Sequence, residues 1–167
     1  MEQVALFIDV DNLSIPVRQE GGDINWDILL GSIKKQINTE TRLDFAKAYF
    51  DVGNKNNSDY CRLLYDRGIE AVYAPVFSFK DALTGQIKNK SLSDPMMICD
   101  IISILYEKAE INNFVIVTSD KDFVPVVRML VKKNKNVMVV GIKKNGYYLS
   151  EECKKLNIPF IDYLAET

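Results

Sequence analysis

The sequence contains no histidine, and its three cysteines, Cys61, Cys99 and Cys153, lie far apart and form no CxxC pair. The usual Cys/His zinc sites are therefore excluded, and the cysteines are typical of free thiols in a reducing compartment. No apolar run reaches the roughly 18 residues that a membrane span needs, and the first residues lack the pattern of a signal peptide. We therefore expect a cytoplasmic protein.

A strong net charge of either sign is also missing, because 21 basic residues nearly balance 23 acidic ones. The formal charge of -2 creates no overall basic field, so any binding of nucleic acid must come from a local patch. Apolar residues make up 47% of the chain and charged residues 26%, which are ordinary values for a globular protein. The length of 167 residues suits one compact domain, and we expect that domain to span residues 1–167.

Short runs of β-forming residues alternate with longer helical patterns along the chain. This alternation predicts right-handed crossovers and a three-layer α/β/α fold around a mostly parallel sheet of five or six strands. The polar stretch 80–93 is expected to be a long irregular loop, which in a compact domain is either functional or merely mobile. The expected strands are 4–10, 44–52, 70–79, 114–119, 136–142 and 159–163, and the expected helices are 26–37, 59–66, 94–110, 122–134 and 148–156.

Acidic residues follow the expected strands at the points where they end. Asp9 and Asp11 come at the end of the first strand, and Asp120 and Asp122 follow the strand 114–119. Asp94 opens the most apolar helix, directly before a proline. Because parallel strands end at the same edge of a sheet and their helices begin there, we expect these carboxylates to converge at that edge.

A cluster of like charges is unfavourable unless something neutralises it, and hard oxygen ligands select Mg²⁺ or Mn²⁺. We therefore predict a divalent metal site. Asp100 lies six residues beyond Asp94, roughly 9 Å along the helix, and is a less certain ligand. Single acids also have simpler interpretations: Asp94 as a helix N-cap, Ser119 and Asp122 as a capping box, and Asp11 with Asn12 as turn formers.

Three segments together resemble the NYN domain, in particular its LabA-like branch within the PIN-like nuclease superfamily. The resemblance covers essentially the whole chain and rests on FIDVDN, KSLSDPMMICD and VTSDKDFVPVVRMLVKKNKNVMVVG, in that order. It departs from the family where glycines are common, at TSDKD and KSLSD, and it places Lys121 between two of the acids. The family is metal-dependent and ribonuclease-like. Carried over, its metal-binding acids match Asp9, Asp94, Asp120 and Asp122, its strand-one amide matches Asn12, and its supporting positions match Ser119 and Asp100.

The resulting prediction is a Mg²⁺- or Mn²⁺-dependent phosphodiesterase that acts on RNA, preferably single-stranded. Lysines outside the acid cluster would position the RNA backbone, and Tyr148, with Tyr147 beside it, would stack on a base. A homodimer is left open. The expected phosphate-binding lysines are Lys88 and Lys90 in the long loop and Lys143 and Lys144 after the strand 136–142.

Two other functions remain open at this point. The first is a phosphatase resembling the haloacid dehalogenases, because DVDN mimics their Asp-x-Asp nucleophile pair; the absence of a later acidic pair argues against it. The second is a catalytically weak domain that binds RNA or a protein. Metal titration and the turnover of a small phosphomonoester would separate these alternatives from the ribonuclease.

Overall fold

A computed structural model describes residues 2–37 and 42–167 and contains a six-stranded parallel sheet. The strand order is β3-β2-β1-β6-β7-β8, and each neighbouring pair is parallel. The predicted three-layer α/β/α fold with a mostly parallel sheet is therefore confirmed. The strands are β1 (Gln3–Asp9), β2 (Arg42–Phe50), β3 (Glu70–Tyr73), β6 (Asn113–Val117), β7 (Asn136–Gly141) and β8 (Phe160–Asp162).

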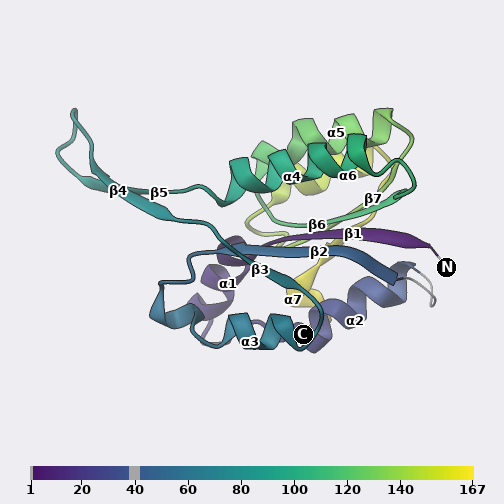
Figure 1. Cartoon of the computed structure of the whole chain (residues 1–167). Helices are drawn as coiled ribbons and strands as arrows, with labels where there is room; N and C mark the ends of the chain where they lie inside the picture. Colours follow the sequence, from purple (N-terminus) through teal and green to yellow (C-terminus); the bar gives the residue numbers. More distant parts are fainter. Residues whose placement is uncertain (1, 38–41) are drawn as a thin grey trace.

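Helices cover both faces of this sheet (Figure 1). One face carries α4 (Ser93–Glu107), α5 (Val124–Lys132) and α6 (Tyr147–Lys155), and the other carries α1 (Val10–Gln19), α2 (Trp26–Ile37), α3 (Tyr60–Tyr65) and α7 (Tyr163–Glu166). Among the described residues, no helix is both long enough and apolar enough to cross a membrane.

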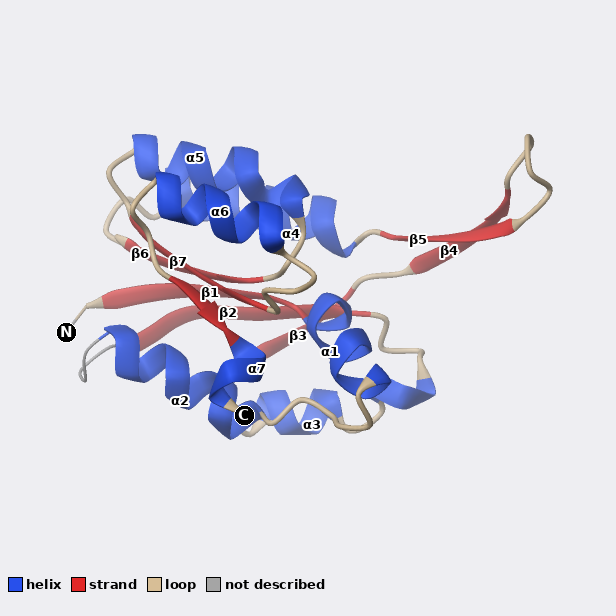
Figure 2. Cartoon of the chain, turned by 180° about the vertical axis from the view of Figure 1, so that it is seen from behind, coloured by secondary structure: helices blue, strands red, loops and turns tan. Residues whose placement is uncertain are grey.

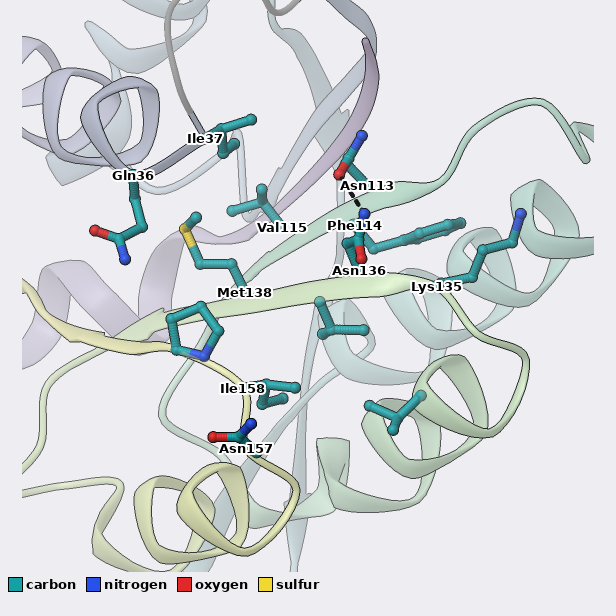
Figure 3. A pocket seen from close by; sticks show the side chains of 13 residues that line it. Gln36, Ile37, Asn113, Phe114, Val115, Lys135, Asn136, Met138, Asn157 and Ile158 are labelled. Atoms are coloured by element: carbon teal, nitrogen blue, oxygen red, sulfur yellow. Dashed lines mark hydrogen bonds between the residues drawn. The ribbon is translucent and has the colours of Figure 1, made fainter.

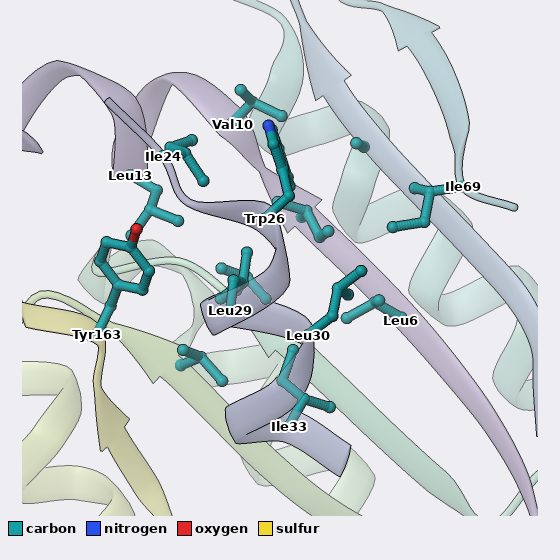
Figure 4. Packing of buried hydrophobic residues seen from close by; sticks show 14 of the residues in the cluster. Leu6, Val10, Leu13, Ile24, Trp26, Leu29, Leu30, Ile33, Ile69 and Tyr163 are labelled. Atoms are coloured by element: carbon teal, nitrogen blue, oxygen red, sulfur yellow. The ribbon is translucent and has the colours of Figure 1, made fainter. Parts of the chain in front are cut away.

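The central strand β1 explains why the core has two halves. Its residues from Val4 to Ile8 are fully buried, and successive side chains point to opposite faces of the sheet. Leu6 and Ile8 pack against the α1–α2–α3 layer, in the same buried cluster as Trp26 and Leu29 of α2 (Figure 4). Phe7 packs on the opposite face, against α4 and α5. A continuous apolar run in the sequence thus becomes a strand buried on both faces, as predicted.

The prediction of one strand over 70–79 is wrong, and so is the prediction of an irregular loop over 80–93. Strand β3 ends at Tyr73, and Pro75 cannot extend its pairing with β2 because proline has no N–H to donate. The chain then forms a separate antiparallel hairpin of β4 (Val76–Lys80) and β5 (Ile87–Ser91). This hairpin extends away from the three layers as an arm (Figure 2).

Helix α1 was not predicted. It begins at Val10, so the first strand ends one residue earlier than the predicted range 4–10. The strand stops at Asp9, whose side chain accepts a hydrogen bond from the Asn12 N–H and so caps the helix. Val10, Leu13 and Val17 are buried at helical spacing, so the pattern was present in the sequence. Pro16 inside the helix obscured it, because proline normally interrupts a helix.

Candidate functional site

The strand order reverses direction between β1 and β6, which are neighbours in the sheet although residues 10–112 separate them in the chain. The connections from β1 to β3 use helices on one face, and those after β6 use helices on the other (Figure 1). In open α/β sheets, such a switch point leaves a crevice at the carboxyl ends of the strands. Asp9 ends β1 at this point, and residues 118–120 follow β6 directly beside it.

Asp9 is the most buried acid of the site, with only 3% of its surface exposed. Its Oδ1 accepts the Asn12 N–H at 3.4 Å, and its Oδ2 accepts the Thr118 hydroxyl at 3.4 Å. Burial raises the pKa of Asp9 well above its ordinary value, and the charge of Asp94 and a hydrogen bond with Asp94 raise it further. Both causes disfavour the charged form of this carboxylate.

Asp94 is the second residue of α4, so the simpler interpretation of this acid as a helix N-cap is wrong. The N-cap position belongs to Leu92, which leaves the Asp94 carboxylate free of a capping role. That carboxylate lies within hydrogen-bonding reach of both Asp9 and Asp120. Burial raises the pKa of Asp94, and the charges of Asp120 and Asp122 raise it too, while the hydrogen bond from Asp9 lowers it.

Residues 118–120 form a tight loop that fixes Asp120. The Asn12 side-chain oxygen accepts the Ser119 N–H at 2.6 Å, and the Ser119 hydroxyl accepts the Ile142 N–H at 2.8 Å. Asp120 caps the 3₁₀ turn η2 (Lys121–Phe123) by accepting the Asp122 N–H at 2.9 Å with Oδ1. The capping-box interpretation of Ser119 and Asp122 is therefore wrong. Ser119 and Asn12 instead join the ends of β1, β6 and β7.

Thr118 is a site residue that the sequence analysis missed. Its hydroxyl contacts Asp9 and also accepts the Asp120 N–H at 3.2 Å, so it connects the two acids. It is buried, with 1% of its surface exposed. Its position directly before Ser119, at the end of a buried strand, was the available signal.

The other predicted acids lie further from this centre. Asp122 is exposed, although its charge still acts on Asp94. Asp11 lies in the first turn of α1, and its Oδ1 accepts a hydrogen bond from the Asn57 side-chain amide at 3.3 Å. Asp100 is not brought to the cluster, since its Oδ2 accepts the Tyr49 hydroxyl at 2.5 Å and pairs with Lys47 at 3.2 Å. The structure thus assembles Asp9, Asp94 and Asp120, with Asp122 at the margin.

Two glycines allow the β7 side of the site to approach the loop 118–120. A Cβ atom on Gly141 would lie 2.6 Å from the Thr118 carbonyl oxygen. A Cβ atom on Gly146 would lie 2.9 Å from the Ser119 carbonyl oxygen and 3.1 Å from its Cα. These contacts involve backbone, which cannot rotate away, so both positions require glycine.

Gly146→Ala is therefore expected to destabilise the protein by about 1–3 kcal/mol and to displace the loop that carries Asp120. Urea unfolding followed by circular dichroism measures the change. Gly31→Ala is the matched control, because a Cβ atom there meets nothing within 4 Å and α2 should gain about 0.5–1 kcal/mol. Equal stabilities of Gly146→Ala and wild type would contradict the close approach.

A polar hollow of about 360 Å³ opens beside Asp120. Asn12, Ser119, Lys121, Gly146 and Tyr148 contribute to its wall. The predicted phosphate-binding lysines are all exposed, but two have ion-pair partners. These are Lys88, which pairs with Asp81, and Lys144, which pairs with Glu20; Lys90 lies on β5 and Lys143 follows β7.

A second cavity, of about 330 Å³, lies at the opposite edge of the sheet (Figure 3). It is lined by residues at the amino ends of β6 and β7, including Asn113 and Asn136, which hydrogen-bond to each other at 3.0 Å. No acidic residue lines it among the described part of the chain. It therefore offers no ligand set for metal chemistry, and the polar edge remains the candidate site.

The donor atoms of the acid cluster suit Mg²⁺ or Mn²⁺, since they are all carboxylate oxygens. Within residues 2–37 and 42–167, no three Asp, Glu or Cys residues are arranged closely enough to enclose a metal ion. Mg²⁺ commonly binds through one or two carboxylates and keeps several waters, so two acids of the cluster Asp9, Asp94 and Asp120 would suffice, without a closed cage of three.

Comparisons with known proteins agree with this fold. A crystal structure of a protein of unknown function from Vibrio parahaemolyticus matches with a TM-score of 0.72 and 20% identity, over 96% of this chain and 92% of that chain. This similarity shows the shared architecture. No curated protein matches the sequence significantly. The family model of the NYN domain matches residues 3–159, and the chain therefore belongs to the NYN domain family.

Proposed function

We propose that this protein is a Mg²⁺- or Mn²⁺-dependent ribonuclease that cleaves single-stranded RNA at the carboxyl edge of the sheet. Family membership supports the proposal, because NYN domains belong to the PIN-like nuclease superfamily, whose members generally use divalent metals. Assignment to the LabA-like branch, on the three segments quoted above, and a cytoplasmic location consistent with three free cysteines are parts of the same proposal.

The convergence of Asp9, Asp94 and Asp120 is the observation that carries this function. They come from three segments far apart in the chain and lie within hydrogen-bonding reach of one another through Asp94. Burial and the neighbouring carboxylates raise the pKa values of Asp9 and Asp94, which is costly for a purely structural arrangement. The cost has a reason if the carboxylates hold a cation.

In this proposal each residue has a separate task. The cluster of Asp9, Asp94 and Asp120 would hold the metal, with at most two of its carboxylates as direct ligands. The bound metal would supply charge neutralisation at phosphorus and an activated water. Asn12 and Ser119 are positioning residues, because their hydrogen bond ties the Asp120 loop to α1. Lys121 and Tyr148 line the adjoining hollow, where a phosphate and a base of the substrate would lie.

Asp120→Asn tests this function, because asparagine is an equally good N-cap and keeps the bond to the Asp122 N–H while removing the charge. We expect cleavage of labelled single-stranded RNA in Mn²⁺ to slow by at least about 100-fold. Asp59→Asn, an exposed acid whose side chain makes no cap bond, should cleave like wild type.

Equal rates for Asp120→Asn and wild type would remove Asp120 from the mechanism. A wild type that binds RNA in EDTA but neither binds Mn²⁺ nor cleaves would favour the alternative of a catalytically weak RNA-binding domain. Rapid turnover of a small phosphomonoester with RNA left intact would favour the phosphatase.

A further inference from the structure

The hairpin arm presents aromatic and basic side chains on one face. Antiparallel pairing places Phe77 opposite Lys90 and Phe79 opposite Lys88. Directly opposed residues share a face of a β-ribbon, and residues two apart on a strand do so as well. Phe77, Phe79, Lys88 and Lys90 therefore form one surface, which we call the Phe–Lys face.

This surface is open to solvent. Phe77 is 56% exposed and Phe79 is 46% exposed, although phenylalanine is usually buried. Aside from the hairpin's own pairing, no hydrogen bond or ion pair among the described residues joins the Phe–Lys face to another element. An isolated two-stranded hairpin is only marginally stable in water, so the exposure of two aromatic rings on it calls for a binding partner.

The charge of the arm indicates what kind of partner it binds. The segment 76–91 contains three lysines and one acid, a net charge of +2 in a chain whose total is -2. The one acid is Asp81. Its carboxylate accepts hydrogen bonds from the Leu83 and Thr84 N–H groups at the tip of the hairpin and pairs with Lys88. The arm is therefore a local basic patch on a weakly acidic protein, which favours a polyanion.

The root of the arm adjoins the acid cluster. The opposite face of the hairpin contributes Val76, Asn89 and Ser91 to a hollow of about 580 Å³ beside α1, so the Phe–Lys face is turned away from α1. Strand β5 ends at Ser91, and α4 begins two residues later with Ser93 and Asp94. A chain held along the arm would therefore lead toward Asp94.

We propose that the Phe–Lys face is an arm that binds single-stranded RNA, with bases stacked on the two phenylalanine rings and phosphates held by Lys90. Phe77 and Phe79 are about 7 Å apart along the strand, which is enough for each ring to contact its own base. Stacking on aromatic side chains combined with nearby lysines is the usual way to bind single strands without reading their sequence. The choice of RNA as the substrate class rests on the proposed function.

The test measures the affinity of the full chain for a fluorescent 12-nucleotide RNA in EDTA, where no cleavage occurs. Phe77→Ala/Phe79→Ala is expected to bind about 30-fold more weakly or worse, because two stacking contacts are lost. Lys90→Gln should reduce the slope of log affinity against log salt by about 0.7, the value for one lost phosphate contact on a single strand. Leu83→Ala/Ile87→Ala is the matched control, since both residues are exposed but neither belongs to the Phe–Lys face.

Unchanged affinity of the phenylalanine double variant would overturn the proposal. So would a wild type that sediments as a dimer together with a double variant that sediments as a monomer, because the face would then bind a second copy. Hydrolysis of bis(p-nitrophenyl) phosphate in Mn²⁺ should be equal in wild type and double variant. If the wild type did not hydrolyse this phosphodiester, the result would count against the proposed nuclease function alone. The RNA affinities that test the arm are measured without metal and do not depend on that activity.

Discussion

Asp94→Asn is expected to slow RNA cleavage in Mn²⁺ by about 10³-fold. The Asp94 carboxylate lies within hydrogen-bonding reach of both Asp9 and Asp120. Because Asp94 lies inside the first turn of α4, its side chain does not cap the helix. A bound metal ion contributes several kcal/mol to the stabilisation of charge in the transition state, and each 1.36 kcal/mol corresponds to a factor of ten. The neutral amide cannot supply the lost charge, although it is almost the same size.

Single-turnover cleavage of a labelled RNA and calorimetric titration with Mn²⁺ together measure the effect of Asp94→Asn. Asp100→Asn is the matched control, because it makes the same change six residues further along the same helix. Its carboxylate is engaged by Tyr49 and Lys47, so we expect cleavage within about threefold of wild type and only a modest loss of stability. If the two variants lost activity equally, the assignment of Asp94 over Asp100 would be wrong.

Asp9→Asn is expected to stabilise the metal-free protein by on the order of 1 kcal/mol while abolishing stabilisation by Mn²⁺. The buried Asp9 has a raised pKa, so at neutral pH folding must either protonate it or bury its charge beside Asp94. Asparagine removes this penalty and still caps α1, because its side-chain oxygen can accept the Asn12 N–H. For wild type, Mn²⁺ at 100 times its Kd should add about 2.7 kcal/mol.

The dependence of stability on pH gives a second measure of the penalty for burying Asp9. Because the folded-state pKa of Asp9 lies above its unfolded value, its stabilising effect is complete below the unfolded pKa, near 4, and is lost as pH rises through the folded pKa. In EDTA the free energy of unfolding of the wild type should therefore fall with rising pH over this window. The free energy of unfolding of Asp9→Asn should fall less. Urea titrations at a series of pH values measure both curves. Identical pH profiles for the two proteins would show that Asp9 does not bear the penalty.

The fold was predictable because its main signals are local. The apolar run from Val4 to Ile8 specifies a strand buried on both faces, and the alternation of strands and helices then specifies a parallel sheet. The hairpin was not predictable in the same way, because the β-forming residues on either side of Pro75 read as one strand. Only the pairing of 76–80 with 87–91, a contact between separate segments, shows that the chain leaves the sheet there.

The site was predictable to the extent that topology determines it. Asp9, Asp94 and Asp120 come together because strands and helices deliver them to one edge, and that rule can be applied to a sequence. The place of Asp100 could not be known in advance, because it depends on Lys47 and Tyr49 of a strand about 50 residues away. Thr118 was missed for a related reason: its hydroxyl matters only once Asp9 and Asp120 are known to lie on either side of it.

The hydrogen bond from the Ser119 N–H to the Asn12 side chain has a consequence for the motions of the protein. It joins the first helix after β1 to the loop after β6, and so connects the two halves of the sheet where β1 and β6 are neighbours. Fraying of α1 and loosening of the 118–120 loop should then occur as one cooperative event rather than as two independent openings. The hollow beside Asp120 would then keep its shape for as long as this hydrogen bond and the one from the Thr118 hydroxyl to Asp9 stay formed.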